Sequence, residues 1–166
     1  MNPTRLWSGA AVALTLGVAA SLVHGEQSRR VRVAETVTVK VSLKVGEQFM
    51  TSTGPGTCTH APKASIYNVP SEMWTVRQEA ETRSTQLTLW RPAGGKEEMF
   101  SLSLSGAKNI DISTVRGGKV TGSGTVKLAP DGKGGRFTID AKTKSGEAIN
   151  GTIECTAFTA AIAEGG

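Results

Sequence analysis

Cysteine and histidine, the side chains that most often serve as metal ligands and as catalytic nucleophile or base, are few in this chain. The 166 residues include two cysteines and two histidines, Cys58, Cys155, His24 and His60. Cys58 and His60 make only half of a structural zinc site, and the sequence offers no second pair of ligands. A catalytic triad needs a base beside a nucleophile, and His60 lies two residues from a cysteine that has another predicted role. We therefore expect no metal, no cofactor and no enzymatic activity, with a hydrolase that uses His60 as the alternative.

Carboxylate pairs and glycine clusters give no stronger signal for catalysis. Glu97 and Glu98 are adjacent, so on a strand their side chains point to opposite faces and cannot flank one glycosidic bond. The glycine clusters lack the strand-to-helix context and the Lys-Ser/Thr ending of phosphate-binding loops. We expect hairpin turns at these clusters, which are Gly94-Gly95, Gly117-Gly118, Gly122-Ser123-Gly124 and Gly134-Gly135.

Aromatic side chains are the remaining candidates for ligand contact, because only 5% of the residues are aromatic. Trp74 and Trp90, with Tyr67 and Arg91 near them in sequence, could line a sugar-binding platform or an apolar pocket. Trp90 follows Leu89 on a predicted strand, so the two side chains face opposite sides of it. The alternative is that both tryptophans fill the core.

The N-terminal segment has the pattern of an export signal. Arg5 supplies a positive charge, an uncharged apolar stretch runs through Leu6 to Val23, and small residues follow. We predict cleavage after Gly25, with cleavage after Ala20 or an uncleaved membrane anchor as alternatives. The prediction is a signal peptide over 1–25 and one domain over 26–166, located in the periplasm or secreted.

An oxidising compartment makes a disulfide between Cys58 and Cys155 the simplest use of the two cysteines. The bridge would close a loop of nearly a hundred residues, and the chain-entropy model assigns such a loop about 4–5 kcal/mol of stabilisation. The predicted bridge would tie the first third of the domain to its last strand.

The charge balance is mildly basic and narrows the range of partners. The formal charge is +5, or +4 without the signal segment and its Arg5. Lysines and arginines are scattered, and few aromatic residues are available to stack on bases, so we exclude nucleic acid as a partner. Weak contact with anionic surfaces fits this charge.

Alternation of apolar and polar residues predicts several strands. Val31 to Val45 alternates almost without interruption, and Thr85 to Arg91 and Glu98 to Ser105 follow the same period of two. In the last strand, Ile149, Ile153 and Cys155 should share the inner face with Gly151 and Ala157. If Asn150-Gly151 is itself a turn, that register shifts.

Other segments are predicted from turn chemistry. Thr51 to Gly56 contains Gly54-Pro55-Gly56 and reads as a loop, and Thr57 to Val69 as a short strand interrupted at Pro62. Pro70-Ser71-Glu72 fits a helical turn or a strand, and Gln78 to Ser84 a polar loop or a short exposed helix. Short strands at this spacing predict an all-β fold, an antiparallel β-sandwich or small barrel of about seven to nine strands with one disulfide.

The layout from Thr57 to Phe158 resembles the mycobacterial surface lipoprotein antigen family. The matching segments are Thr57-Cys58-Thr59, the Asp131-Gly132 turn, and Gly151-Thr152-Ile153-Glu154-Cys155. This chain departs from the family because no lipid-attachment cysteine follows the signal. The resemblance implies a non-catalytic protein of the envelope or secreted fraction that works in contact or adhesion.

The sequence therefore predicts an exported, non-enzymatic β-sandwich with a binding or structural role and an envelope or extracellular partner. The alternative within the same fold is a carrier that holds an apolar or sugar ligand between its sheets near Trp74 and Trp90.

Overall fold

The fold is all-β in a computed structural model that describes residues 35–161. These residues belong to a single compact unit. The predicted signal peptide and the first residues of the strand predicted from Val31 lie outside the described residues. The ten strands are β1 (Thr36–Val45), β2 (Gln48–Ile66), β3 (Val69–Ala80), β4 (Arg83–Pro92), β5 (Met99–Ser105), β6 (Ile110–Ser113), β7 (Gly122–Asp131), β8 (Gly134–Thr143), β9 (Ala148–Cys155) and β10 (Thr159–Ala160).

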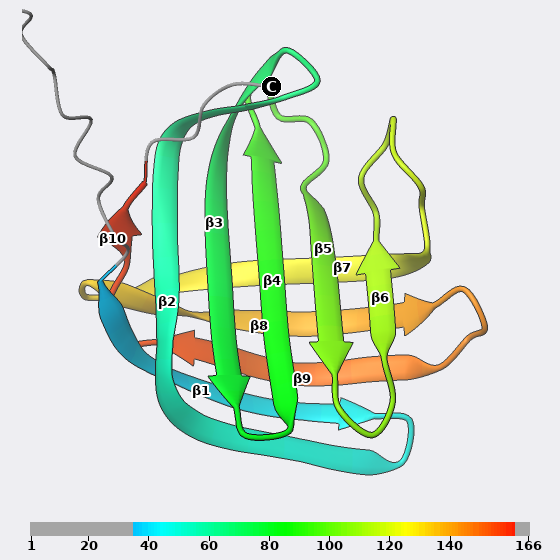
Figure 1. Ribbon diagram of the computed structural model, residues 1–166. Coiled ribbons are helices and arrows are strands. Elements are labelled where there is room, and N and C mark those ends of the chain that lie inside the picture. Colours follow the sequence, from blue (N-terminus) through cyan, green and yellow to red (C-terminus); the bar gives the residue numbers. More distant parts are fainter. Residues whose placement is uncertain (1–34, 162–166) are drawn as a thin grey trace, which may run out of the picture. The chain divides into compact units, whose positions relative to one another are not determined.

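The strands form one antiparallel sheet in the order β6-β5-β4-β3-β2-β1-β9-β8-β7, with the two-residue β10 parallel to β2. The sheet folds over itself into a nearly closed barrel. In Figure 1 the strands β3 to β6 cross β1 and β7 to β9 at a steep angle, and β2 bends from one layer into the other. The seam between the two end strands carries a hydrogen bond of 3.0 Å from the Thr121 amide to the Ser113 carbonyl. The predicted fold class is confirmed.

Alternating side chains account for the regular strands. On β1, Val39, Val41 and Leu43 are at most 1% exposed, while the residues between them face outward. On β5, Phe100 and Leu102 follow the same pattern. The strands predicted at these positions are confirmed, because each buries one row of apolar side chains against the other layer.

The predicted loop at Gly54-Pro55-Gly56 is wrong, since these residues lie inside β2. Here β2 leaves its pairing with β1 and begins its pairing with β3, which starts at Gly56. A Cβ atom at Gly56 would lie 2.5 Å from the Arg77 carbonyl oxygen and 2.7 Å from Cγ2 of Val39, so only glycine fits this crossing. Pro55 precedes the pairing with β3, where its missing N–H costs the ladder nothing.

The polar loop predicted at Gln78 to Ser84 is also wrong. The strands β3 and β4 extend through most of it and leave only a turn at 81–82. Gln78 is 3% exposed, but its side-chain amide donates to the Val39 carbonyl at 2.7 Å and accepts a hydrogen bond from the Ser52 hydroxyl at 2.6 Å. A buried glutamine with both ends paired lines the corner where β2 bends.

Several smaller expectations are settled by the strand pairing. The pairing of β2 with β3 shifts between Ala61 and Ala64, which confirms the interruption at Pro62, and Pro70-Ser71-Glu72 lies in β3 as a strand. The hairpin turns expected at Gly122-Ser123-Gly124 and Gly134-Gly135 are wrong, because these residues lie in β7 and β8. Asn150-Gly151 lies in β9, so the alternative register of the last strand is wrong as well. Gly117-Gly118 joins β6 to β7, but these strands stand at opposite ends of the order and form no hairpin ladder.

The predicted disulfide is present. Cys58 on β2 and Cys155 on β9 are joined, with 97 residues between them in sequence, and they are 0% and 5% exposed. Both sulfur atoms belong to the main core cluster, so the bridge lies inside the barrel.

Bulky side chains fill the space between the layers. Phe100 and Phe137 are at most 1% exposed and pack in a single cluster with the aliphatic residues of the inner faces. The fully buried members of the cluster include Leu43, Leu87, Leu89, Leu102, Ile112, Ile139, Ile149, Ile153, Val39 and Val41. Ligand contact is therefore to be sought at the ends and on the outer faces of the barrel.

Candidate functional site

Three regions of the surface have the shape or composition of a binding site. One is a stack of planar side chains at an edge of the core, the second is an apolar patch on the outside of β3 to β5, and the third is one mouth of the barrel. Among residues 35–161 there is no group of three side chains placed to hold a metal ion. The described residues also contain no helix with the length and hydropathy of a membrane span.

The first region, the inner stack, consists of His60, Trp74 and Arg91. The imidazole of His60 lies parallel to the indole of Trp74, with ring centroids 4.6 Å apart and an interplanar angle of 2°. The guanidinium carbon of Arg91 lies 4.9 Å from the centroid of the same indole. The two groups reach Trp74 from β2 and β4, the strands on either side of β3, and leave the tryptophan 5% exposed.

Carboxylates stand beside the outer members of the inner stack. Glu98 accepts a hydrogen bond from Nε of Arg91 at 2.5 Å, and Oε2 of Glu72 lies 3.7 Å from Nε2 of His60. An open cleft of about 440 Å³ runs along the stack, with Leu128 and Phe158 on its far side. Because the indole is nearly covered, the cleft offers a ligand little of the ring surface that a sugar platform requires.

The cleft contains little that a hydrolase would use. Nε2 of His60 is buried and has no hydrogen-bond partner, and the nearby hydroxyl of Thr159 donates to the Cys58 carbonyl at 3.2 Å. No serine or free thiol lines this cleft among the residues that the structure describes. The observed contacts of His60 are those of a packing residue.

The second region, the outer patch, consists of Met73, Trp90 and Met99. These residues are cross-strand neighbours on β3, β4 and β5, on the face opposite the core, and all three are half-buried. The row continues to Ala61 on β2, which is 1% exposed beneath its larger neighbours. A tryptophan between two methionines on an outer sheet face is a composition enriched in protein contact surfaces.

Tyr67 lies close to the outer patch but belongs to a turn and not to one of the three strands that carry the patch. It occupies the β2–β3 turn with φ 48°, which is unusual for a residue other than glycine, and it is 56% exposed. Its ring rests on the backbone at Gly117, where an added Cβ would lie 3.1 Å from the ring. Tyr67 and Met99 line one cleft of about 430 Å³, so the turn extends the apolar surface beyond Met99.

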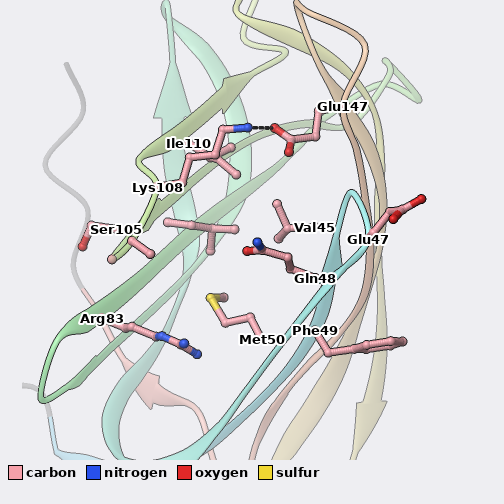
Figure 2. A pocket seen from close by; sticks show the side chains of 13 residues that line it. Val45, Glu47, Gln48, Phe49, Met50, Arg83, Ser105, Lys108, Ile110 and Glu147 are labelled. Atoms are coloured by element: carbon pink, nitrogen blue, oxygen red, sulfur yellow. Dashed lines mark hydrogen bonds and ion pairs between the residues drawn. The ribbon is translucent and has the colours of Figure 1, made fainter.

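The third region, the barrel mouth, is a cleft of about 290 Å³ between the turns at one end of the barrel. Its lining combines the apolar side chains of Val45, Met50, Leu104 and Ile110 with polar residues that include Gln48. Figure 2 shows Lys108 paired with Glu147 at the rim, 2.6 Å apart, and Arg83 reaching from the opposite wall toward Met50. Phe49 points away from the cleft and is 77% exposed.

The structure divides the four predicted ligand-binding residues among different places. Trp74 and Arg91 meet in the inner stack, Trp90 faces the other side of the sheet, and Tyr67 lies in a turn. Sequence reasoning missed the partners that complete these regions, which are His60 in the stack and Met73 and Met99 in the patch. The pairing register carried that information, because only register decides which residues of neighbouring strands lie side by side.

The chain was compared with protein-family models, with curated proteins and with solved structures, and none of the three comparisons found a match. The domain is an antiparallel β-barrel with a filled core and a buried disulfide.

Proposed function

We propose that this chain is an exported, non-enzymatic protein of the cell envelope or secreted fraction that acts by binding, and that the outer patch makes the contact. One observation carries the proposal. Trp90 is half-buried between Met73 and Met99 on an outer face, while the barrel interior is occupied by its own side chains. A binding function therefore has a surface available and does not require an internal cavity.

The chemistry of the outer patch supports binding to an apolar surface of an envelope or extracellular partner. Tryptophan and methionine offer large contact areas, and methionine adapts its shape to the partner. Polar residues of the next row, Thr75, Thr88 and Ser101, border the patch on the same face. An apolar centre with a polar border is the usual arrangement of a contact surface.

The proposed location rests on three features. The disulfide points to an oxidising compartment, as found outside the cell or in the periplasm. The sequence pattern of residues 1–25 and the resemblance to mycobacterial surface lipoprotein antigens supply the export step. We expect the exported protein to begin at residue 26, which N-terminal sequencing measures, and protein retained in the cytoplasm with its leader attached contradicts this.

Partners other than an apolar surface receive less support. The inner stack covers Trp74, so a sugar or apolar carrier built around both tryptophans lacks a shared chamber. Weak contact with anionic surfaces stays a proposal that rests on the net charge of +4 that remains without Arg5. The hydroxyl of Thr159 in the cleft beside His60 donates to the Cys58 carbonyl, so no observed contact favours hydrolysis through His60.

The test measures binding of the full chain to the envelope fraction of the cells that produce it, by co-sedimentation. We expect saturable binding that drops at least about tenfold in Trp90→Ser/Met99→Ser, because central aromatic contacts carry most of the energy of an interface. Gln86→Ser, on the same outer face, is the matched control and should bind normally. Equal binding by all three proteins contradicts the proposal, as does a measured turnover that disappears in His60→Ala.

A further inference from the structure

At the barrel mouth, apolar side chains lie beside a cation, Arg83, that has no carboxylate partner in the part of the chain that the structure describes. Among the described residues, Lys108 pairs with Glu147, Arg91 with Glu98 and Arg116 with Glu97, but no carboxylate pairs with Arg83. Its aliphatic part lies against Gly106, where an added Cβ would stand 3.1 Å from Cγ of Arg83. This contact holds the arginine at the rim of the cleft.

Figure 2 shows which groups face this cleft. The side chains of Met50 and Val45 point into it, and Arg83 extends toward Met50 from the other wall. Glu47 points away, and Glu147 is neutralised by Lys108, with side-chain exposures of 24% and 63% for the two partners. Arg83 is therefore the cation available to a ligand in the mouth.

We propose that the barrel mouth binds a single-chain amphiphile, with its anionic head group on Arg83 and its alkyl chain on Val45 and Met50. A guanidinium presents paired N–H donors that match a carboxylate or phosphate. Mouths of β-barrels are common ligand sites, and a volume of about 290 Å³ limits the ligand to one short chain. This site is distinct from the outer patch and adds to the proposed function.

The four methionines allow one experiment to read both sites. Met50 lines the mouth, and Met73 and Met99 belong to the outer patch, so methyl NMR of the full chain reports each region separately. Met50→Leu assigns the mouth signal. Titration with decanoate, below its micelle concentration, should shift the Met50 methyl saturably and leave Met73 and Met99 in place.

Charge variants test the head group. Arg83→Gln should weaken decanoate binding about tenfold, because a charge-assisted pair is lost, and should leave decanol binding unchanged. Arg77→Gln, another exposed arginine, is the control and should bind decanoate normally. Glu147→Gln removes a nearby negative charge and frees Lys108, so it should tighten decanoate binding several-fold. Thermal unfolding checks that each variant is folded.

Each other outcome overturns the proposal in a defined way. No saturable Met50 shift means that the mouth does not bind amphiphiles. Equal affinity for decanoate and decanol, or no effect of Arg83→Gln on decanoate binding, shows that Arg83 does not bind an anionic head group. A Met50 shift with phosphatidylglycerol vesicles but not with decanoate assigns the mouth to a lipid surface. If decanoate shifts only the methyl signals of Met73 and Met99, the outer patch is the binding site, and the proposal that the barrel mouth binds amphiphiles is wrong.

Discussion

The two tryptophans of the domain show how neighbouring strands give one residue type two roles. Trp90 directly follows Leu89, which is the cross-strand partner of Trp74, and yet the two indoles face opposite sides of the sheet. Trp74 is 5% exposed between His60 and Arg91, whereas Trp90 is half-buried between two methionines. A one-residue offset separates a side chain that completes the core from one that forms a contact surface.

This contrast implies that changes on the inner side act on stability and changes on the outer side act on binding. The following predictions test that division, beginning with the disulfide, which lies next to the inner stack because Cys58 and His60 occupy the same face of β2.

Removal of the disulfide should have the largest effect. Cys58→Ala/Cys155→Ala releases a loop with 97 residues of sequence separation, and we expect a loss of about 4 kcal/mol in the free energy of unfolding. Urea unfolding followed by circular dichroism measures it. A loss below about 1 kcal/mol would show that the bridge constrains the unfolded chain much less than the chain-entropy model requires.

Truncation of Trp74 should cause the second-largest loss in the free energy of unfolding. Trp74→Ala leaves a cavity at the edge of the core and unpairs His60 and Arg91, so we expect a loss of about 3 kcal/mol. Trp90→Ala is the matched comparison and should cost less than about 1 kcal/mol, since Trp90 lies on the outer face and is only half-buried. Equal losses in the two variants would remove the distinction between the inner and outer tryptophan.

His60 should contribute through its stacked ring and not through catalysis. His60→Ala should lower the free energy of unfolding by about 1 kcal/mol, and His60→Phe should restore most of that loss because it keeps an aromatic partner for Trp74. The measurement is the urea midpoint of each variant at one pH. If His60→Phe is as unstable as His60→Ala, the stacking interpretation is wrong.

The ion pair between Arg91 and Glu98, at the outer end of the stack, should contribute least to the free energy of unfolding. Glu98→Gln removes the partner of Arg91, whose side chain is 43% exposed, so the expected loss is below about 1 kcal/mol. High salt should reduce the difference between wild type and variant, because exposed pairs are screened. A salt-independent loss of several kcal/mol would place this pair in the core of the stack.

Sequence reasoning succeeded where one local pattern was enough. Alternation identified β1, β4 and β5 with their buried faces, and the cysteine count identified the bridge. It failed at Gly54-Pro55-Gly56 and at Gln78, where glycine, proline and a polar side chain lie within strands. Both positions lie at the corner of β2, where this strand passes from its pairing with β1 to its pairing with β3. The residues used there are of the types that normally mark a loop.

The candidate sites depended more strongly on tertiary structure. Composition singled out Trp74, Trp90, Tyr67 and Arg91, but it gave no means of grouping them, because the contact between two strands depends on register across the whole sheet. The sequence alone determined an all-β, disulfide-bonded domain, since the period of the side chains and the number of cysteines are properties of the chain itself. Only the folded barrel decided which tryptophan became covered and which stayed at the surface, because that depends on which strands meet. Strand pairing also placed at the barrel mouth an arginine, Arg83, that has no carboxylate partner among residues 35–161.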